Sequence, residues 1–104
     1  MAEVLTIEEL RRQIDVIDDQ LVRLLNVRVA CAVEVGRLKH DVGLPIYQPE
    51  RETQVLSKVR ESATKLSGPL TAEAVVRIFE RIIDEARRAE RVASERRENL
   101  EAGE

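Results

Sequence analysis

Aromatic residues, cysteine and long apolar runs are scarce in this sequence, and each absence excludes a class of protein. The 104 residues include one Tyr, one Phe and no Trp, so the hydrophobic core must be built from aliphatic side chains. Cys31 is the single cysteine, which excludes an intrachain disulfide, and its small apolar neighbours indicate a core residue rather than a reactive thiol. No apolar run approaches the roughly 18 residues of a membrane span, and the N-terminus lacks a secretory signal pattern. We therefore expect a soluble, cytoplasmic protein with no membrane partner.

Charged residues are abundant, but neither sign dominates. Seventeen Lys and Arg stand against twenty Asp and Glu, which gives a net charge of −3. Nucleic-acid-binding domains normally show a basic excess or a basic cluster. We therefore expect no DNA or RNA partner.

The apolar residues recur with helical spacing throughout, and strand-like alternation is absent. Thr6 followed by Glu9 fits a capping box that opens a first helix at Ile7. Apolar residues then recur every three or four positions, with no proline before Pro45, so this helix is predicted to end near His40 or Asp41. Its apolar stripe consists of Ile7, Leu10, Ile14, Ile17, Leu21, Leu24, Leu25, Cys31 or Ala32, Val35 and Leu38.

This first helix is too long for a compact monomer. About 33 residues at ~1.5 Å rise give a rod of roughly 50 Å, whereas a compact domain of about 100 residues has a radius of gyration near 13 Å. Part of the apolar stripe would protrude into solvent. We therefore expect a homodimer in which the long helices of two copies pair.

Two more helices complete an all-α fold. Pro49 fits the first position of the second helix, which ends by "LSGPL", and Thr71 caps the third. We expect a single domain over 1–104, with an ordered helical core over 5–92 and a charged, frayed tail over 93–104. The inward face of the third helix is predicted to hold Ala74, Val75, Phe79, Ile82, Ile83, Ala86 and Ala93.

Several charges occupy positions where apolar residues are expected. Arg28 falls on the stripe of the first helix, and Lys39 shares its face about 16 Å further along. Chain reversal through "HDVGLPIYQP" brings Arg51 and Glu52 back beside Lys39. Three cations around one acceptor suit a small dianion that also carries a hydroxyl. The alternative is structural: Arg28 and Lys39 extend to solvent or pair with nearby acids, and Arg51 and Glu52 are solvated first-turn charges.

Glu90 is an acidic residue at a position where the spacing of the third helix predicts an apolar one. One interpretation is that the apolar face simply ends there. The other is that the helix packs over the pocket, which would desolvate Glu90, raise its pKa and make it a neutral hydrogen-bond donor near pH 7.

The chain carries an ordered set of motifs within "LRRQIDVIDDQLVRLLNVRVACAVEVGRLK", "LPIYQPERE" and "IFERIIDEARRAE". This set, from about Leu10 to Glu90, resembles the all-α chorismate mutases of the AroQ class, which are intertwined homodimers of three helices. The resemblance implies a Claisen rearrangement of chorismate to prephenate in the shikimate pathway, on the route to phenylalanine and tyrosine. It implies no cofactor, no metal and no covalent intermediate.

The resemblance also implies roles for the cations. Arg28 and Arg11 would bind the substrate carboxylates, with Arg11 supplied by the other subunit, since 17 residues of helix place it about 25 Å from Arg28. Lys39 would donate to the ether oxygen and a carboxylate, and Arg51 would reinforce the positive field.

For the remaining positions, the resemblance implies that Glu52 accepts from the ring hydroxyl and that Val35 and Ile83 form apolar walls. Arg28, Lys39 and Glu90 would be the catalytic residues.

Three positions depart from the family pattern. Gln48 stands where some members have Asp, which weakens a helix cap and a contact near the ring hydroxyl. Ala86 stands where some have Ser, which deletes a hydrogen bond. Glu90 stands where many bacterial members have Gln, and an ionised carboxylate there would repel the developing negative oxygen, so Glu90 must be protonated to help.

Two alternatives to a mutase stay open. An isochorismate–pyruvate lyase would use the same scaffold and similar cations. A non-catalytic helical dimerisation or regulatory module would keep the fold without turnover. A partner enzyme of the shikimate pathway that docks on the protein is a further possibility.

Overall fold

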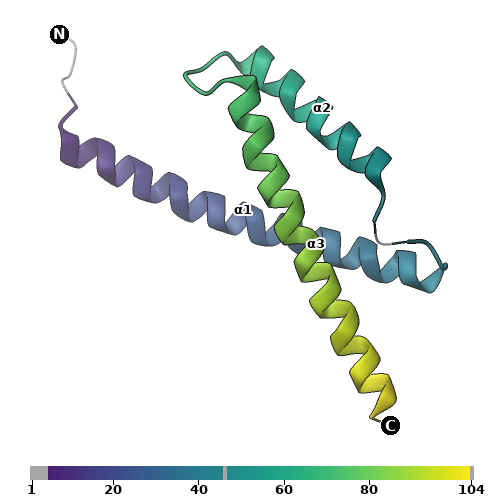
Figure 1. Ribbon diagram of the computed structural model, residues 1–104. Helices are drawn as coiled ribbons and strands as arrows, with labels where there is room; N and C mark the ends of the chain where they lie inside the picture. The colour runs from purple at the N-terminus through teal and green to yellow at the C-terminus, as the bar shows by residue number, and fades with distance from the viewer. Residues whose placement is uncertain (1–4, 46, 104) are drawn as a thin grey trace.

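The computed structural model describes residues 5–45 and 47–103 and consists of three helices. These are α1 (Ile7–Asp41), α2 (Pro49–Leu66) and α3 (Ala72–Ala102), and the described residues contain no strand (Figure 1). The predicted all-α class and the order of its three helices are therefore confirmed. Within the described ranges, none of the helices offers a stretch long and apolar enough for a membrane span.

Helix α1 is a single uninterrupted rod whose two ends are fixed by local hydrogen bonds. At its start, Thr6 and Glu9 form the predicted capping box, since each side chain accepts from the other's backbone N–H. At its end, the Leu44 N–H donates to the Lys39 carbonyl at 2.8 Å and the Gly43 N–H donates to the His40 carbonyl at 3.1 Å. This Schellman pattern needs a left-handed residue, which Gly43 supplies with φ of 75°. The chain therefore turns away at Gly43, just after the last turn of α1.

The starts of α2 and α3 differ in how well they are capped. Thr71 accepts from the Ala74 N–H at 3.1 Å, as the sequence predicts. Pro49 occupies the first turn of α2, but its N-cap Gln48 makes no side-chain capping hydrogen bond. The N-terminus of α2 is therefore held by proline geometry and first-turn acids rather than by a side-chain cap.

Helix α3 is the centre of the molecule because it packs against both α1 and α2. In Figure 1 it crosses the C-terminal half of α1, while α2 runs back along its N-terminal half. The predicted inward face of α3 is half-buried along its length, and Ala86 is the one buried apolar residue among the described positions, with 5% exposed. The core of a single chain is therefore thin.

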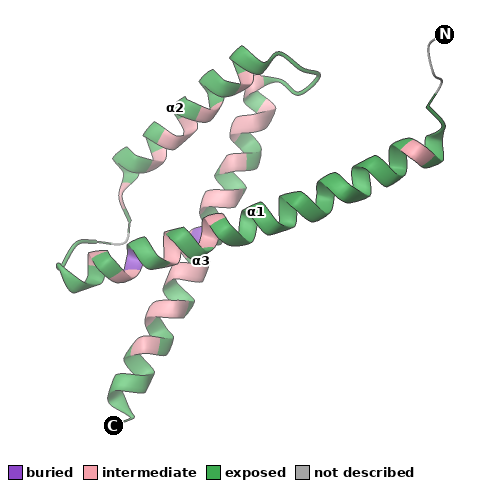
Figure 2. Cartoon of the chain, turned by 180° about the vertical axis from the view of Figure 1, so that it is seen from behind, coloured by how far each residue is buried: buried purple, intermediate pink, exposed green. Residues whose placement is uncertain are grey.

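The molecule is elongated, as the length of the first helix predicts. Its radius of gyration is 18.5 Å and its extents are 68 × 29 × 16 Å, whereas a compact chain of this size has a radius near ~13 Å. The N-terminal half of α1 projects away from the other helices, and Figure 2 colours nearly all of it exposed. Ile14 is 54% exposed and Leu21 51%. The predicted apolar stripe thus lies open in the single chain.

Two expectations differ from the structure. Helix α3 continues to Ala102 instead of fraying from residue 93, because this segment is rich in strong helix formers and the Gly103 N–H closes its last turn on the Asn99 carbonyl. Cys31 is exposed in the single chain rather than part of a core.

Candidate functional site

A pocket of about 280 Å³ lies between the C-terminal half of α1, the start of α2 and the middle of α3. This volume is near the lower end of the roughly 300–1,000 Å³ usual for ligand sites, which suits a small molecule. The lining residues are Arg28, Cys31, Ala32, Val35 and Lys39 from α1, Gln48, Arg51, Glu52 and Val55 from α2 and its N-cap, and Ile83, Ala86, Arg87 and Glu90 from α3.

Every residue predicted for the site lines this pocket except Arg11. The turn at Gly43 brings Arg51 and Glu52 to the wall that Lys39 ends, as the sequence predicts. Arg11 lies near the other end of the unbroken α1, on the half that projects away from α2 and α3. A single chain therefore cannot bring Arg11 to its own pocket.

The two cations of α1 are half-buried at the pocket wall. The Arg28 guanidinium lies 5.9 Å from the centroid of the Phe79 ring, which partly desolvates it and fixes its position against α3. Lys39 lies in the last turn of α1, where a positive charge is also favoured by the helix dipole. Arg28 is turned inward, as the interrupted stripe predicts, but it is not fully buried.

Glu90 reaches α1 at a position that lacks a side chain. Gly36 is buried, and a Cβ added to it would lie 3.5 Å from Cγ of Glu90. Glycine within a helix is usually only tolerated, whereas Gly36 is the surface on which Glu90 packs. Gly36 follows Val35 directly and lies about one helical turn before Lys39. This position in the sequence could have drawn attention to Gly36.

Burial raises the pKa of the Glu90 carboxyl. The positive charges of Lys39 and Arg87 oppose this increase in pKa, and the negative charge of Glu52 adds to it. The structure thus supports the interpretation in which α3 packs over the pocket, rather than the one in which its apolar face simply ends.

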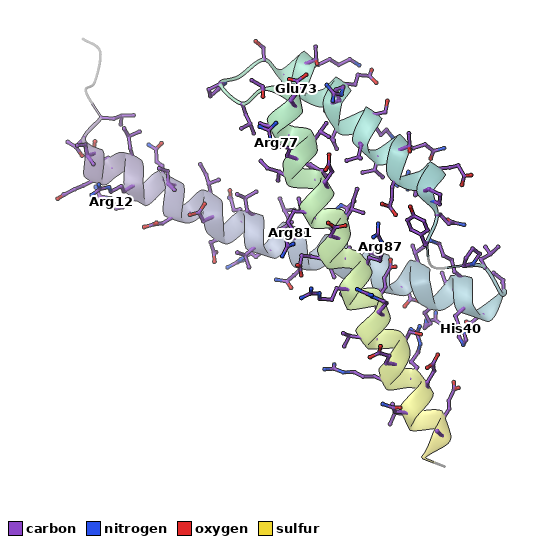
Figure 3. The ribbon with its side chains drawn as sticks, in the orientation of Figure 1. Arg12, His40, Glu73, Arg77, Arg81 and Arg87 are labelled. Atoms are coloured by element: carbon purple, nitrogen blue, oxygen red, sulfur yellow. The ribbon has the colours of Figure 1, made fainter. Side chains whose placement is uncertain are left out.

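Four lining residues are absent from the predicted site: Cys31, Ala32, Val55 and Arg87. Arg87 is the charged one among them. Its Nη2 lies 2.5 Å from Oε1 of Glu52, and its guanidinium lies 5.1 Å from the centroid of the Tyr47 ring. Figure 3 labels Arg87 on the middle of α3, where it joins the helix to the linker and to α2. Its spacing of four residues after Ile83 and three before Glu90 could have predicted its place on the pocket face.

The pocket carries excess positive charge in a chain whose net charge is −3. Its four cations, contributed by all three helices, face two carboxyl groups, which gives 4 − 2 = +2 with both ionised and +3 with Glu90 protonated. Apolar walls from α1, α2 and α3 lie between these charges. The arrangement can therefore bind a small dianion, position its apolar ring and accept one hydrogen bond at Glu52.

The described residues include no group of three or more His, Cys, Asp or Glu side chains placed to hold a metal ion. The described pocket contains no His, Ser or Thr, and its ionisable side chains are Arg, Lys, Glu and Cys31. These side chains can bind an anion, stabilise charge and exchange hydrogen bonds or protons.

Comparison with known proteins identifies the family. The sequence model of chorismate mutase type II matches residues 10–91. A bifunctional chorismate mutase/prephenate dehydratase of Aquifex aeolicus (strain VF5) is 40% identical over 78 residues, which cover 74% of this chain and 22% of that protein. The protein of the same name from Neisseria gonorrhoeae is 39% identical over 90 residues, which cover 83% of this chain and 24% of that protein.

A shorter relative is the chorismate mutase of Methanocaldococcus jannaschii, which is 36% identical over 53 residues, covering 51% of this chain and 54% of that protein. The chain thus spans about a quarter or less of the two bifunctional relatives and about half of this one. The family match, by contrast, extends over most of the chain and includes every residue of the pocket. On that match, the chain belongs to the chorismate mutase type II family.

Proposed function

We propose that this protein is a chorismate mutase, an isomerase that converts chorismate to prephenate in phenylalanine and tyrosine biosynthesis. The observation that carries the proposal is the pocket itself, in which cations from three helices surround one acceptor carboxylate and one desolvated carboxyl. Chorismate is a dianion with a ring hydroxyl, so each kind of group in the pocket has a counterpart on the substrate.

The reaction breaks the ether C–O bond and forms a C–C bond within one molecule, so no atom is added or removed. The protein accelerates such a step by holding the reactive conformer and by stabilising the negative charge that develops on the ether oxygen. Arg28 binds a carboxylate, Lys39 donates to the ether oxygen and to a carboxylate, and Arg51 adds to the positive field. Arg28 and Lys39 are half-buried, which strengthens their interactions relative to bulk water, whereas Arg51 is exposed.

Two carboxyl groups have opposite roles in this proposal. Glu52 accepts from the ring hydroxyl, while Glu90, whose pKa is raised by burial, donates to the ether oxygen in its protonated form. Val35, Ile83 and Ala86 shape the apolar wall on which the ring lies, and Gln48 contributes neutral polarity beside the hydroxyl.

The functional unit in this proposal is a cytoplasmic homodimer. The exposed stripe on the projecting half of α1 supports dimerisation, because large apolar patches on a free surface are unfavourable. The same half carries Arg11, so pairing of two α1 helices would deliver Arg11 of one copy to the pocket of the other. Two relatives combine a mutase and a dehydratase by name, which supports a further shikimate-pathway enzyme as a partner.

The test is the disappearance of chorismate, followed by absorbance, with isochorismate assayed in parallel. We expect chorismate to be converted to prephenate and Lys39→Ala to abolish the conversion, while Arg23→Ala, an exposed cation on the same helix, leaves it unchanged. Release of pyruvate from isochorismate at a higher kcat/KM than chorismate turnover would favour the lyase. A folded protein that turns over neither compound would be a helical binding module.

A further inference from the structure

The ion pair between Arg87 and Glu52 differs from the other ion pairs among the described residues. Its side chains are 33% and 28% exposed and come from different helices, whereas each of the other pairs includes a side chain that is at least half exposed. Exposed ion pairs contribute little to stability because water and salt screen their charges. A partly desolvated, charge-assisted pair at the wall of a pocket restricts the orientation of both side chains.

We infer that Arg87 is a positioning residue for the proposed reaction: it fixes the Glu52 carboxylate and offsets its negative charge, so that Glu52 can accept a hydroxyl of a dianionic ligand. This inference rests on the proposed function. The contact uses Oε1 of Glu52, which leaves the carboxylate's other oxygen, Oε2, as the acceptor in this arrangement. Arg87 thus acts through Glu52.

Arg87 is itself fixed from two sides. The Tyr47 ring lies against its guanidinium at 5.1 Å, and Nη1 lies 3.7 Å from Oδ1 of Asp84 on the preceding turn. Tyr47 belongs to the linker that carries the chain from α1 to α2. Arg87, on α3, therefore contacts both the linker and α2, next to the place where Glu52 lines the pocket.

Offsetting the charge of Glu52 matters because the pocket must accept a dianion. An ionised Glu52 without a counter-charge would repel the ligand carboxylates and would also repel an ionised Glu90. The groups that face Glu90 are Lys39 from α1, Glu52 from α2 and Arg87 from its own helix, and Arg28 and Arg51 line the same pocket. Arg87 thus affects both the binding of the ligand and the protonation of Glu90.

The first test is a double-mutant cycle on kcat/KM with Arg87→Met, Glu52→Gln and both together. A lost hydrogen bond to a charged group costs roughly 10- to 100-fold, so we expect Arg87→Met to lower kcat/KM by about that range. The loss should fall mainly on KM, because the hydroxyl contact is present in both the ground state and the transition state. In the Glu52→Gln background, Arg87→Met should have little further effect.

The matched control is Arg81→Met on the same helix, where Arg81 pairs with Glu85 in solvent and lies outside the pocket (Figure 3). It should leave kcat and KM unchanged. Arg87→Lys keeps the charge but loses the forked geometry, so it should recover part of the loss. The inference would be overturned if the fold-losses of kcat/KM in Arg87→Met and Glu52→Gln simply multiplied in the double variant. Arg87 would then act independently of Glu52.

A second readout does not depend on turnover. Titration of the Glu90 side-chain carboxyl, followed by carbon-13 NMR, should show a higher pKa in Arg87→Met than in the wild type, because one positive charge is lost and Glu52 is no longer offset. Arg81→Met should leave the titration unchanged. If the wild type does not turn over chorismate, the proposed function fails while this titration still decides the role of Arg87. An unchanged Glu90 titration in Arg87→Met would overturn it.

Discussion

Glu90 is the residue whose ionisation most directly limits the proposed chemistry. Because burial raises its pKa, the folded protein keeps Glu90 protonated at pH values where the same residue in the unfolded chain is ionised. A protonated Glu90 can donate to the ether oxygen, and an ionised one would repel it. The protein should therefore lose catalytic efficiency as pH rises through the pKa of Glu90.

We predict that kcat/KM of the wild type falls about tenfold per pH unit above this pKa. Glu90→Gln keeps the hydrogen-bond donor and removes the titration, so its profile should be flat over the same range. The measurement is kcat/KM for chorismate from about pH 4 to 9. A Gln variant that shows the same decline as the wild type would assign the titration to another group.

The same shift affects stability in a definite direction. Since the folded pKa lies above the unfolded one, ionisation of Glu90 opposes folding once the pH exceeds the unfolded value of about 4.3. The resulting loss of folding free energy grows until the pH passes the pKa of Glu90 in the folded protein, and then stays constant. Glu90→Gln should therefore be more stable than the wild type above this window and no more stable below it, as measured by urea unfolding at several pH values.

Gln48 is a second residue whose effect can be isolated. It is the N-cap of α2 but its side chain makes no capping hydrogen bond, so the backbone N–H groups of the first turn after Pro49 lack a side-chain acceptor there. Gln48→Asp should raise the free energy of unfolding by about 1 kcal/mol. The control is Gln54→Asp, which adds the same charge inside α2. An equal gain in both variants would show that charge near the dipole, and not capping, is responsible.

At the scale of the helices, the contact between α1 and α3 depends on Gly36. A Cβ at this position would make an ordinary contact of 3.5 Å with Glu90, while a larger side chain would displace it. Gly36→Ala should thus gain about 0.5–1 kcal/mol of stability, as expected for replacing glycine within a helix, with kcat/KM retained. Gly36→Val should lower kcat/KM by moving Glu90 away from the pocket.

Urea unfolding and chorismate turnover of the two Gly36 variants check this prediction. The contact with Glu90 would be contradicted if alanine and valine had the same effect on kcat/KM.

The helix boundaries are the part of the fold that the sequence predicts well. Most helix ends are set by a residue that acts only on its near neighbours in the sequence. These residues are Thr6, Gly43, Pro49 and Thr71. Their effect can therefore be predicted without knowing the tertiary structure. The end of α3 is the exception, because a charged composition is compatible with both a solvated helix and a frayed tail.

The pocket is predicted less completely, for a physical reason. Periodicity identifies residues that share a helix face. It puts Arg28 and Lys39 on one face and leaves the place of Glu90 open, and all three residues line the pocket. It does not give the register of one helix on another. Two contacts arise from that register: the Arg87–Glu52 pair and the packing of Glu90 on Gly36. The first joins residues 35 positions apart in the sequence (87 − 52) and the second joins residues 54 positions apart (90 − 36). Neither contact therefore follows from local spacing.

At the scale of the whole molecule, the proposed dimer gives a role to the projecting half of α1. This half carries exposed apolar residues and Arg11, and it extends away from the pocket of its own chain. Pairing of two copies would bury the apolar stripe and supply the missing cation at the same time. The proposed mutase is thus a dimer whose two pockets each use both chains.

Complementation between two inactive variants tests this claim most directly. Arg11→Ala and Arg28→Ala should each be inactive as homodimers, while Arg12→Ala, the adjacent cation, should be active. After the two inactive variants are unfolded together and refolded, about half of the dimers are mixed, and each mixed dimer has one intact pocket.

The measurement is the rate of chorismate disappearance in this refolded mixture. We predict recovery of about a quarter of the wild-type activity, since half of the dimers carry one intact pocket out of two. No recovery, in a mixture shown to contain mixed dimers, would contradict it, because each pocket would then draw Arg11 and Arg28 from the same chain.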